Sequence, residues 1–156
     1  LKPREEMEGI VEYVSKEELL RQSDVVSLHV DLNPTSEGLL TKAEFDQMKP
    51  GASLVNASRG PVVNTADLIN ALKDGPLAFA ALDTVEGEGP IFNADHRQDG
   101  LKGEPLVEEL HAMDNVILTP HIAFFTNIAV QNMVDISLDD VITILNGQPS
   151  EHEVAN

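Results

Sequence analysis

Ionisable side chains stand directly after three apolar segments that the sequence predicts as strands: Arg59 after 53–56, Asp83 to Glu88 after 78–82, and His121 after 115–118. The carboxyl ends of parallel strands lie at one edge of a sheet, where such sheets bind their ligands. An imidazole held by a carboxylate acts as a general acid and base, since the carboxylate stabilises the protonated ring. A guanidinium binds a carboxylate or phosphate through two parallel hydrogen bonds. The three segments together therefore predict an acid–base site for a small anion.

Each of these residues also has an ordinary interpretation. Arg59 could form a surface ion pair, and His121, which follows Thr-Pro, could be a structural histidine at a turn. Glu86 and Glu88 could be solvated charges in a very acidic chain, and Asp83 could cap a turn. It is less expected that all three segments lack a functional role than that any one of them does.

The other histidines carry less information. His29 ends a predicted strand at the same edge, His96 lies in a polar and charged segment that predicts a solvated loop, and His111 and His152 are expected at the surface. No pair has the spacing of metal ligands, so we predict no metal site. The sequence has neither a phosphate-binding P-loop nor a serine nucleophile motif.

Strands and helices alternate along the predicted chain. Strands are expected at 10–14, 25–28, 53–56, 78–82 and 115–118. Helices are expected at 16–22, 41–48, 66–73 with Thr65 as N-cap, 105–110 and 127–145. A polar loop is expected at 31–38 and a long loop at 86–104. This alternation predicts an α/β fold, with a parallel sheet and flanking helices. The last helix has a wide apolar stripe, which suggests burial on more than one side.

The composition excludes several classes of partner. The chain of 156 residues has 27 acidic and 10 basic residues, a net charge of −17, and no Lys or Arg after Lys102. Nucleic acids and anionic membranes require clustered positive charge, so neither is expected as a partner. The chain has no cysteine, and hence no disulfide or thiolate site. Without a signal peptide or an apolar run of membrane length, the expected location is the cytoplasm.

The sequence resembles the D-isomer-specific 2-hydroxyacid dehydrogenases, and among them the NAD-dependent D-lactate dehydrogenases. Four pieces carry the resemblance in the family's order and spacing: Ser23-Asp-Val-Val-Ser-Leu-His29, Met48-Lys-Pro-Gly-Ala-Ser-Leu-Val-Asn-Ala-Ser-Arg-Gly60, Leu82-Asp-Thr-Val-Glu-Gly-Glu88 and Thr119-Pro-His-Ile-Ala-Phe-Phe-Thr126. The long loop through 91–95 and the residues after His121 favour the D-lactate or D-2-hydroxyisocaproate enzymes, since the phosphoglycerate and glyoxylate reductases of the family are usually shorter in that loop. A D-2-hydroxyisocaproate, glyoxylate or hydroxypyruvate reductase of the same family stays the alternative to a D-lactate dehydrogenase.

The resemblance implies a role for each site residue. Arg59 would bind the substrate carboxylate, His121 would exchange the proton of the keto oxygen, and Glu88 would pair with His121. The residues implied to bind NAD are Val30, Asp31, Ser36, Ala57, Ser58, Arg59 and Asp83, and Phe124 would shape the substrate pocket. Asp31 stands where the family usually has proline, and Asn64 where it usually has aspartate.

The resemblance also implies that this sequence is the C-terminal half of a longer enzyme. The glycine-rich phosphate loop and the first strand of a Rossmann-like fold would precede Leu1. Residues 1–121 would then be an incomplete NAD-binding domain, and 122–156 a helix and tail returning to an absent substrate domain. The expected reaction is reduction of a small 2-keto acid, pyruvate to D-lactate, with NADH, and the expected assembly a homodimer.

A non-catalytic protein on the same scaffold is the second hypothesis, either a cofactor-sensing regulator or an inactive remnant. The intact set of Arg59, Glu88 and His121 favours the enzyme, because a decayed copy has no need of them. The length of the open reading frame before Leu1 would discriminate between the two.

Overall fold

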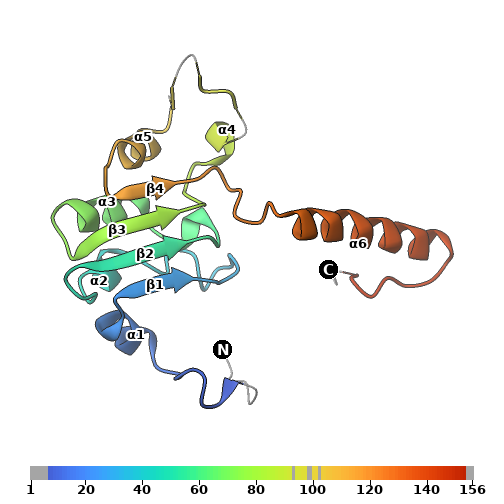
Figure 1. Cartoon of the computed structure of the whole chain (residues 1–156), viewed down its shortest axis with the longest axis horizontal. Helices are drawn as coiled ribbons and strands as arrows, with labels where there is room; N and C mark the ends of the chain where they lie inside the picture. The colour runs from blue at the N-terminus through green and yellow to red at the C-terminus, as the bar shows by residue number, and fades with distance from the viewer. Residues whose placement is uncertain (1–6, 93, 98–99, 102, 154–156) are drawn as a thin grey trace. The chain divides into compact units, whose positions relative to one another are not determined.

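Four parallel strands form one sheet, and their order in space is their order in the sequence (Figure 1). The computed structural model describes residues 7–92, 94–97, 100–101 and 103–153. The strands are β1 (Val25–Leu28), β2 (Ala52–Asn56), β3 (Leu77–Leu82) and β4 (Val116–Leu118). Parallel pairing joins Leu28 to Asn56 and Asn56 to Leu82, so the three strands end level with one another.

Short helices connect the strands: α1 (Lys16–Gln22) before β1, α2 (Lys42–Phe45), the 3-10 helix η2 (Gly60–Val62), α3 (Thr65–Lys73), α4 (Gly89–Phe92) and α5 (Pro105–His111). Every crossover steps in the same direction along the sheet, and right-handed crossovers then place their helices on the same face. In Figure 1, α2 and α3 lie behind the sheet. The predicted α/β, Rossmann-like fold is thus confirmed.

The two faces of the sheet differ in burial. Side chains that point to the helices, such as Val26, Leu54 and Ala80, are buried. Those on the opposite face are not, and Val25 and Ile117 are 59% and 55% exposed. Alternation along each strand therefore directs one set of residues into the core and leaves the other face open.

The strand predicted at 10–14 is wrong, because residues 11–15 form no helix or strand. Ile10 and Tyr13 are 73% and 48% exposed, and neither belongs to the four-stranded sheet that the described residues form. Alternating apolar residues form a strand only beside a partner that completes the backbone hydrogen bonds.

Three smaller predictions also need correction. Asn64, not Thr65, caps α3, since its side chain accepts a hydrogen bond from the Asp67 amide at 2.9 Å. The predicted helix at 41–48 is helical only as α2, with turns to Met48. The predicted loop at 86–104 contains α4.

The chain divides into two units, Leu1–His121 and Ile122–Asn156. The second unit contains α6 (Asn127–Leu145), which begins at the predicted residue and buries none of its side chains. Its tail folds back, and Ser150 and His152 both bond Asp140 Oδ1, at 2.7 and 3.0 Å. The assignment of the two units to a cofactor domain and a returning segment stays a prediction.

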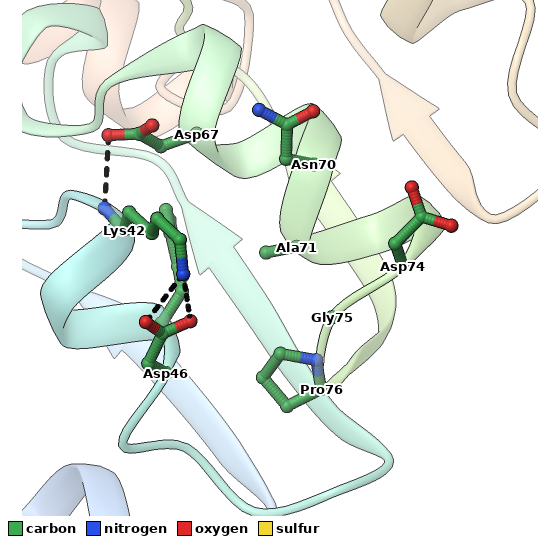
Figure 2. Close-up of a pocket in the computed structure, with 9 residues that line it drawn as sticks. Lys42, Asp46, Asp67, Asn70, Ala71, Asp74, Gly75 and Pro76 are labelled. Carbon is green, nitrogen blue, oxygen red and sulfur yellow. Dashed lines mark hydrogen bonds and ion pairs between the residues drawn. The ribbon is translucent and has the colours of Figure 1, made fainter.

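A small cavity of about 170 Å³ lies between α2 and α3 (Figure 2). Lys42 closes one side, where its amide donates to Asp67 and its ammonium to Asp46. Gly75 and Pro76, on the other side, precede β3 and so mark the amino ends of the strands. Ligands of open α/β sheets bind at the carboxyl ends, so this cavity is not the candidate site.

Acid should weaken the contact between α1 and α2. The Lys16 ammonium, 2.9 Å from Glu44, and hydrogen bonds from Thr41 lower the pKa of Glu44 from 4.5 to about 2. A lowered pKa stabilises the fold above the unfolded value of 4.5, and this stability is lost as the pH falls towards 2. Urea unfolding should therefore show that Glu44→Gln costs about 1 to 2 kcal/mol at neutral pH and almost nothing near about pH 2. A loss of stability on Glu44→Gln that does not change with pH would contradict the role given to this carboxylate.

Candidate active site

Asn56, the last residue of β2, shapes the turn that presents Arg59. Its side chain is 1% exposed, and its Oδ1 accepts hydrogen bonds from the Ser58 amide and hydroxyl at 3.0 and 2.8 Å. Its Nδ2 donates to the Arg59 carbonyl at 3.1 Å. The Arg59 guanidinium is exposed and donates to the Ser58 carbonyl at 2.7 Å. A rigid main chain therefore carries a long cationic side chain that reaches solvent at the edge of the sheet.

Asp83 connects the ends of β2, β3 and β4 through hydrogen bonds. Its amide donates to the Asn56 carbonyl at 2.8 Å, and its carboxylate accepts from the Thr119 hydroxyl at 2.6 Å. Its carbonyl accepts from the His121 amide at 2.9 Å. The side chain is 7% exposed, so these bonds satisfy a buried charge. The loop with His121 is thus fixed to the end of β3.

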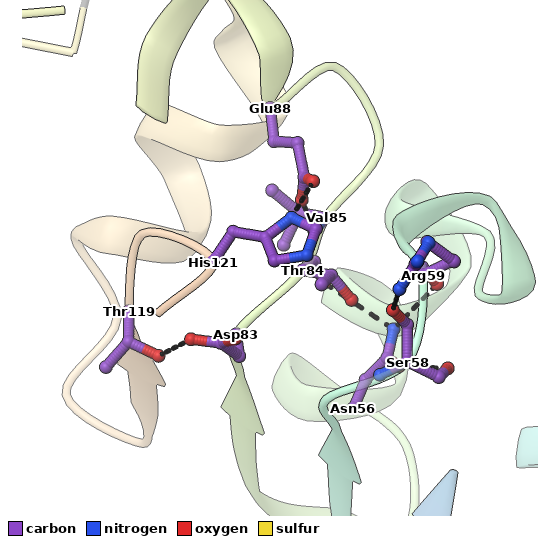
Figure 3. A network of polar contacts seen from close by, with 9 residues as sticks. All are labelled: Asn56, Ser58, Arg59, Asp83, Thr84, Val85, Glu88, Thr119 and His121. Carbon is purple, nitrogen blue, oxygen red and sulfur yellow. Dashed lines mark hydrogen bonds and ion pairs between the residues drawn. The ribbon is translucent and has the colours of Figure 1, made fainter. Parts of the chain in front are cut away.

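His121 and Glu88 form the ion pair at the centre of the site (Figure 3). His121 Nδ1 lies 2.6 Å from Glu88 Oε1, and the Val85 amide donates to Glu88 Oε2 at 2.7 Å. The carboxylate is therefore oriented by a main-chain donor and faces the ring. A carboxylate on Nδ1 fixes the tautomer of a histidine and stabilises its protonated form.

The backbone of His121 adopts a left-handed conformation, with φ of 53°. Among the described residues it is the one non-glycine with positive φ. Such a conformation strains a residue with a Cβ, and strain of this kind is concentrated at functional sites. The surrounding hydrogen bonds of Asp83 and Thr119 hold the residue there.

Gly60 lets the Arg59 segment lie directly against the Glu88 segment. A Cβ added at Gly60 would stand 2.2 Å from the Val85 carbonyl carbon and 2.6 Å from the Glu86 amide nitrogen. The Glu86 carboxylate also accepts from the Thr65 amide, at 2.8 Å. Only glycine permits this approach, and it brings the guanidinium and the imidazole to one edge (Figure 3).

The remaining residues that the sequence assigned to a cofactor lie at the ends of β1 and β2. Val30 is half-buried and Asp31 exposed, and the Ser36 hydroxyl donates to the Asp31 carbonyl at 2.6 Å, so Ser36 fixes this loop. Ala57 is exposed and small, and it leaves the backbone open to a ligand.

Phe124 belongs to the second unit, where its ring meets Phe125 edge to face with centroids 6.0 Å apart. Its predicted place in a substrate pocket stays a prediction. Sequence reasoning missed Asn56 and Thr119. A polar residue at the end of a buried strand is the signal that could have found them.

In the described part of the chain, no group of three His, Asp or Glu side chains is placed to hold a metal ion. None of the described helices has the length and apolar content that a membrane span requires.

Residues 1–123 match the family described as D-isomer specific 2-hydroxyacid dehydrogenase, NAD binding domain. The chain belongs to this family. Its predicted cofactor, NAD, is accordingly the cofactor of this domain. A D-lactate dehydrogenase of Staphylococcus aureus (strain MSSA476) is 40% identical over 149 residues, which are 96% of this chain and 45% of that protein.

Solved structures agree with this family membership. A D-lactate dehydrogenase from Sporolactobacillus superposes with a TM-score of 0.93 at 48% identity, and covers 100% of this chain and 47% of its own. The D-lactate dehydrogenase of Lactobacillus jensenii, solved with NAD+, has a TM-score of 0.92 at 37% identity, with the same shares covered. The chain thus spans less than half the length of the relatives it matches.

Proposed function

We propose that this chain supplies the NAD-binding part and the acid–base residues of a dehydrogenase that reduces a small 2-keto acid, pyruvate to D-lactate. The contact between His121 Nδ1 and Glu88 Oε1, at 2.6 Å, carries the proposal. It pairs an acid–base group with its carboxylate at the edge where open α/β sheets bind their ligands. The intact pair of His121 and Glu88 favours an enzyme over a non-catalytic protein, whether a cofactor-sensing regulator or an inactive remnant.

Several residues fit a bound dinucleotide. Ala57 leaves an exposed stretch of backbone beside the buried Ser58, and Asp83 places a nearly buried carboxylate at the end of β3. With Val30, Asp31 and Ser36 they would hold NAD along the strand ends. When bound, NADH supplies the hydride for the keto carbon.

The protein's own residues orient the substrate and supply the proton. Arg59 would release the Ser58 carbonyl and bind the substrate carboxylate through its guanidinium. Since Nδ1 of His121 is held by Glu88, the proton passes to the keto oxygen from Nε2. The carboxylate stabilises the imidazolium before the transfer, and water restores the proton afterwards. In the reverse direction the neutral ring accepts the proton of the hydroxy acid.

The substrate is tested by NADH oxidation, followed at 340 nm, with the protein as its gene encodes it. Pyruvate should give a kcat/KM at least about tenfold above 4-methyl-2-oxopentanoate, glyoxylate and hydroxypyruvate, because a pocket commonly discriminates by about 1 to 3 kcal/mol. A higher value for one of the other acids would assign that substrate instead. NADH binding without turnover of any acid would favour the cofactor-sensing hypothesis.

The remainder of the assembly follows from the same proposal. The segment 122–156 would return to a substrate-binding domain, where Phe124 would line the pocket, and the full-length protein would form a homodimer. Light scattering on the full-length protein would show directly whether it is a homodimer.

A further inference from the structure

His96 occupies an unexpected position for a residue in a polar loop. Both ring nitrogens face main-chain carbonyl oxygens: Nδ1 lies 3.0 Å from the Gly100 oxygen, and Nε2 bonds the Ile91 oxygen. The Gly100 amide also donates to the His96 carbonyl, at 2.9 Å. The described residues of the 91–100 segment are thus connected through this side chain.

The protonation state of the ring decides how many of these bonds can form. A neutral imidazole has one N–H group and can donate to one carbonyl, whereas the imidazolium donates to both. A carbonyl oxygen cannot donate, so the second contact is a hydrogen bond only when the ring is doubly protonated. In each tautomer the ring therefore donates to one main-chain carbonyl oxygen, either that of Ile91 or that of Gly100.

The charged groups around His96 are few. Asp95 and Arg97, its neighbours in sequence, form an ion pair with each other at 2.6 Å. From α5, His111 lines the same cavity of about 450 Å³. The other described lining residues near the ring, on α4 and after β4, are apolar or uncharged.

The segment held by His96 is joined to the candidate site at two points. The Glu88 carbonyl accepts from the Ile91 and Phe92 amides, at 3.0 and 2.8 Å, so Glu88 begins α4 and Ile91 lies in it. Ile91 is 2% exposed and anchors α4 in the core. The cavity that His96 lines is also bounded by Thr119 and Pro120, which directly precede His121.

We infer that His96 is a positioning residue: its ring braces α4 against Gly100, through the Ile91 and Gly100 carbonyls, and thereby holds Glu88 against His121. The inference rests on the proposed function for its effect on catalysis, and the brace itself is independent of turnover.

Amide hydrogen exchange, measured by NMR on the chain, tests the brace without any substrate. The protection factors of the Ile91 and Phe92 amides should be about tenfold lower in His96→Phe, which fills the same space without a donor, than in the parent, because a hydrogen bond of the brace is lost. His111→Gln, from the same cavity, should behave as the parent does. Parent-like protection of both amides in His96→Phe would overturn the brace.

The ¹⁵N shift of His121 Nδ1 reports the hydrogen bond to Glu88 and tests the positioning role. It should move in His96→Phe and stay at the parent value in His111→Gln. An unchanged shift in His96→Phe would confine His96 to its loop and overturn the inference. Neither measurement depends on catalysis, so a failure of the proposed reaction would leave both results interpretable.

Discussion

Replacing His121 with asparagine should lower kcat for keto acid reduction by a factor of about 10² to 10⁴, the usual contribution of a general acid. Asparagine tolerates the left-handed backbone at φ 53°, whereas alanine would add strain to the loss of the ring. NADH affinity should remain within about twofold, since the ring is paired with Glu88 and His121 is not among the residues proposed to bind NAD.

Two variants accompany His121→Asn in the same assay. Glu88→Gln keeps the shape of the partner and removes its charge, so it should lower kcat less than His121→Asn does. His111→Asn, an exposed histidine at the end of α5, should leave kcat unchanged. Parent-like turnover in His121→Asn would remove His121 from the mechanism and require another proton donor.

Replacing Gly60 with alanine should destabilise the protein by about 3 kcal/mol or more. The added methyl would lie 2.2 Å from the Val85 carbonyl carbon and 2.3 Å from its oxygen, and both are main-chain atoms beside a buried side chain. Main chain cannot rotate away as the end of a side chain can. The 85–88 segment or the turn of Arg59 must therefore shift, and the ion pair of His121 and Glu88 shifts with it.

The matched control is Gly89→Ala, because a Cβ at Gly89 meets nothing within 4 Å. Urea unfolding should give Gly89→Ala nearly the stability of the parent, within about 0.5 kcal/mol. A cost below about 1 kcal/mol for Gly60→Ala would show that the two segments separate easily, contrary to the close approach described above.

The sequence predicted the strands that carry the site, because buried parallel strands leave short apolar runs that end in polar residues. It also predicted that Arg59, Asp83 and His121 lie at one edge of the sheet, because the carboxyl ends of parallel strands share an edge. The resemblance, and not periodicity, singled out Glu88 as the partner of His121, 33 residues away. The roles of these residues in catalysis stay predictions.

The failures have a physical origin. The alternation at 10–14 is a strand pattern, but strand formation depends on a neighbouring strand that this part of the chain does not meet. Asn64 and Thr65 are both good N-caps, and one residue of register decides between them. His96 does lie in a loop with exposed neighbours, as predicted. Its hydrogen bonds could not be predicted, because the acceptors are main-chain carbonyls of Ile91 and Gly100 and any residue type supplies those.

The strand order β1-β2-β3-β4 has a consequence for how the sheet assembles during synthesis. Each strand pairs with the one made just before it, so no pairing has to wait for a distant part of the chain. Parallel sheets usually fold slowly because their strands are joined across long loops. Here each crossover joins strands that are consecutive in the sequence, although the one from β3 to β4 is longer and contains both α4 and α5. The sheet can therefore grow from β1 to β4 in the direction in which a ribosome delivers it.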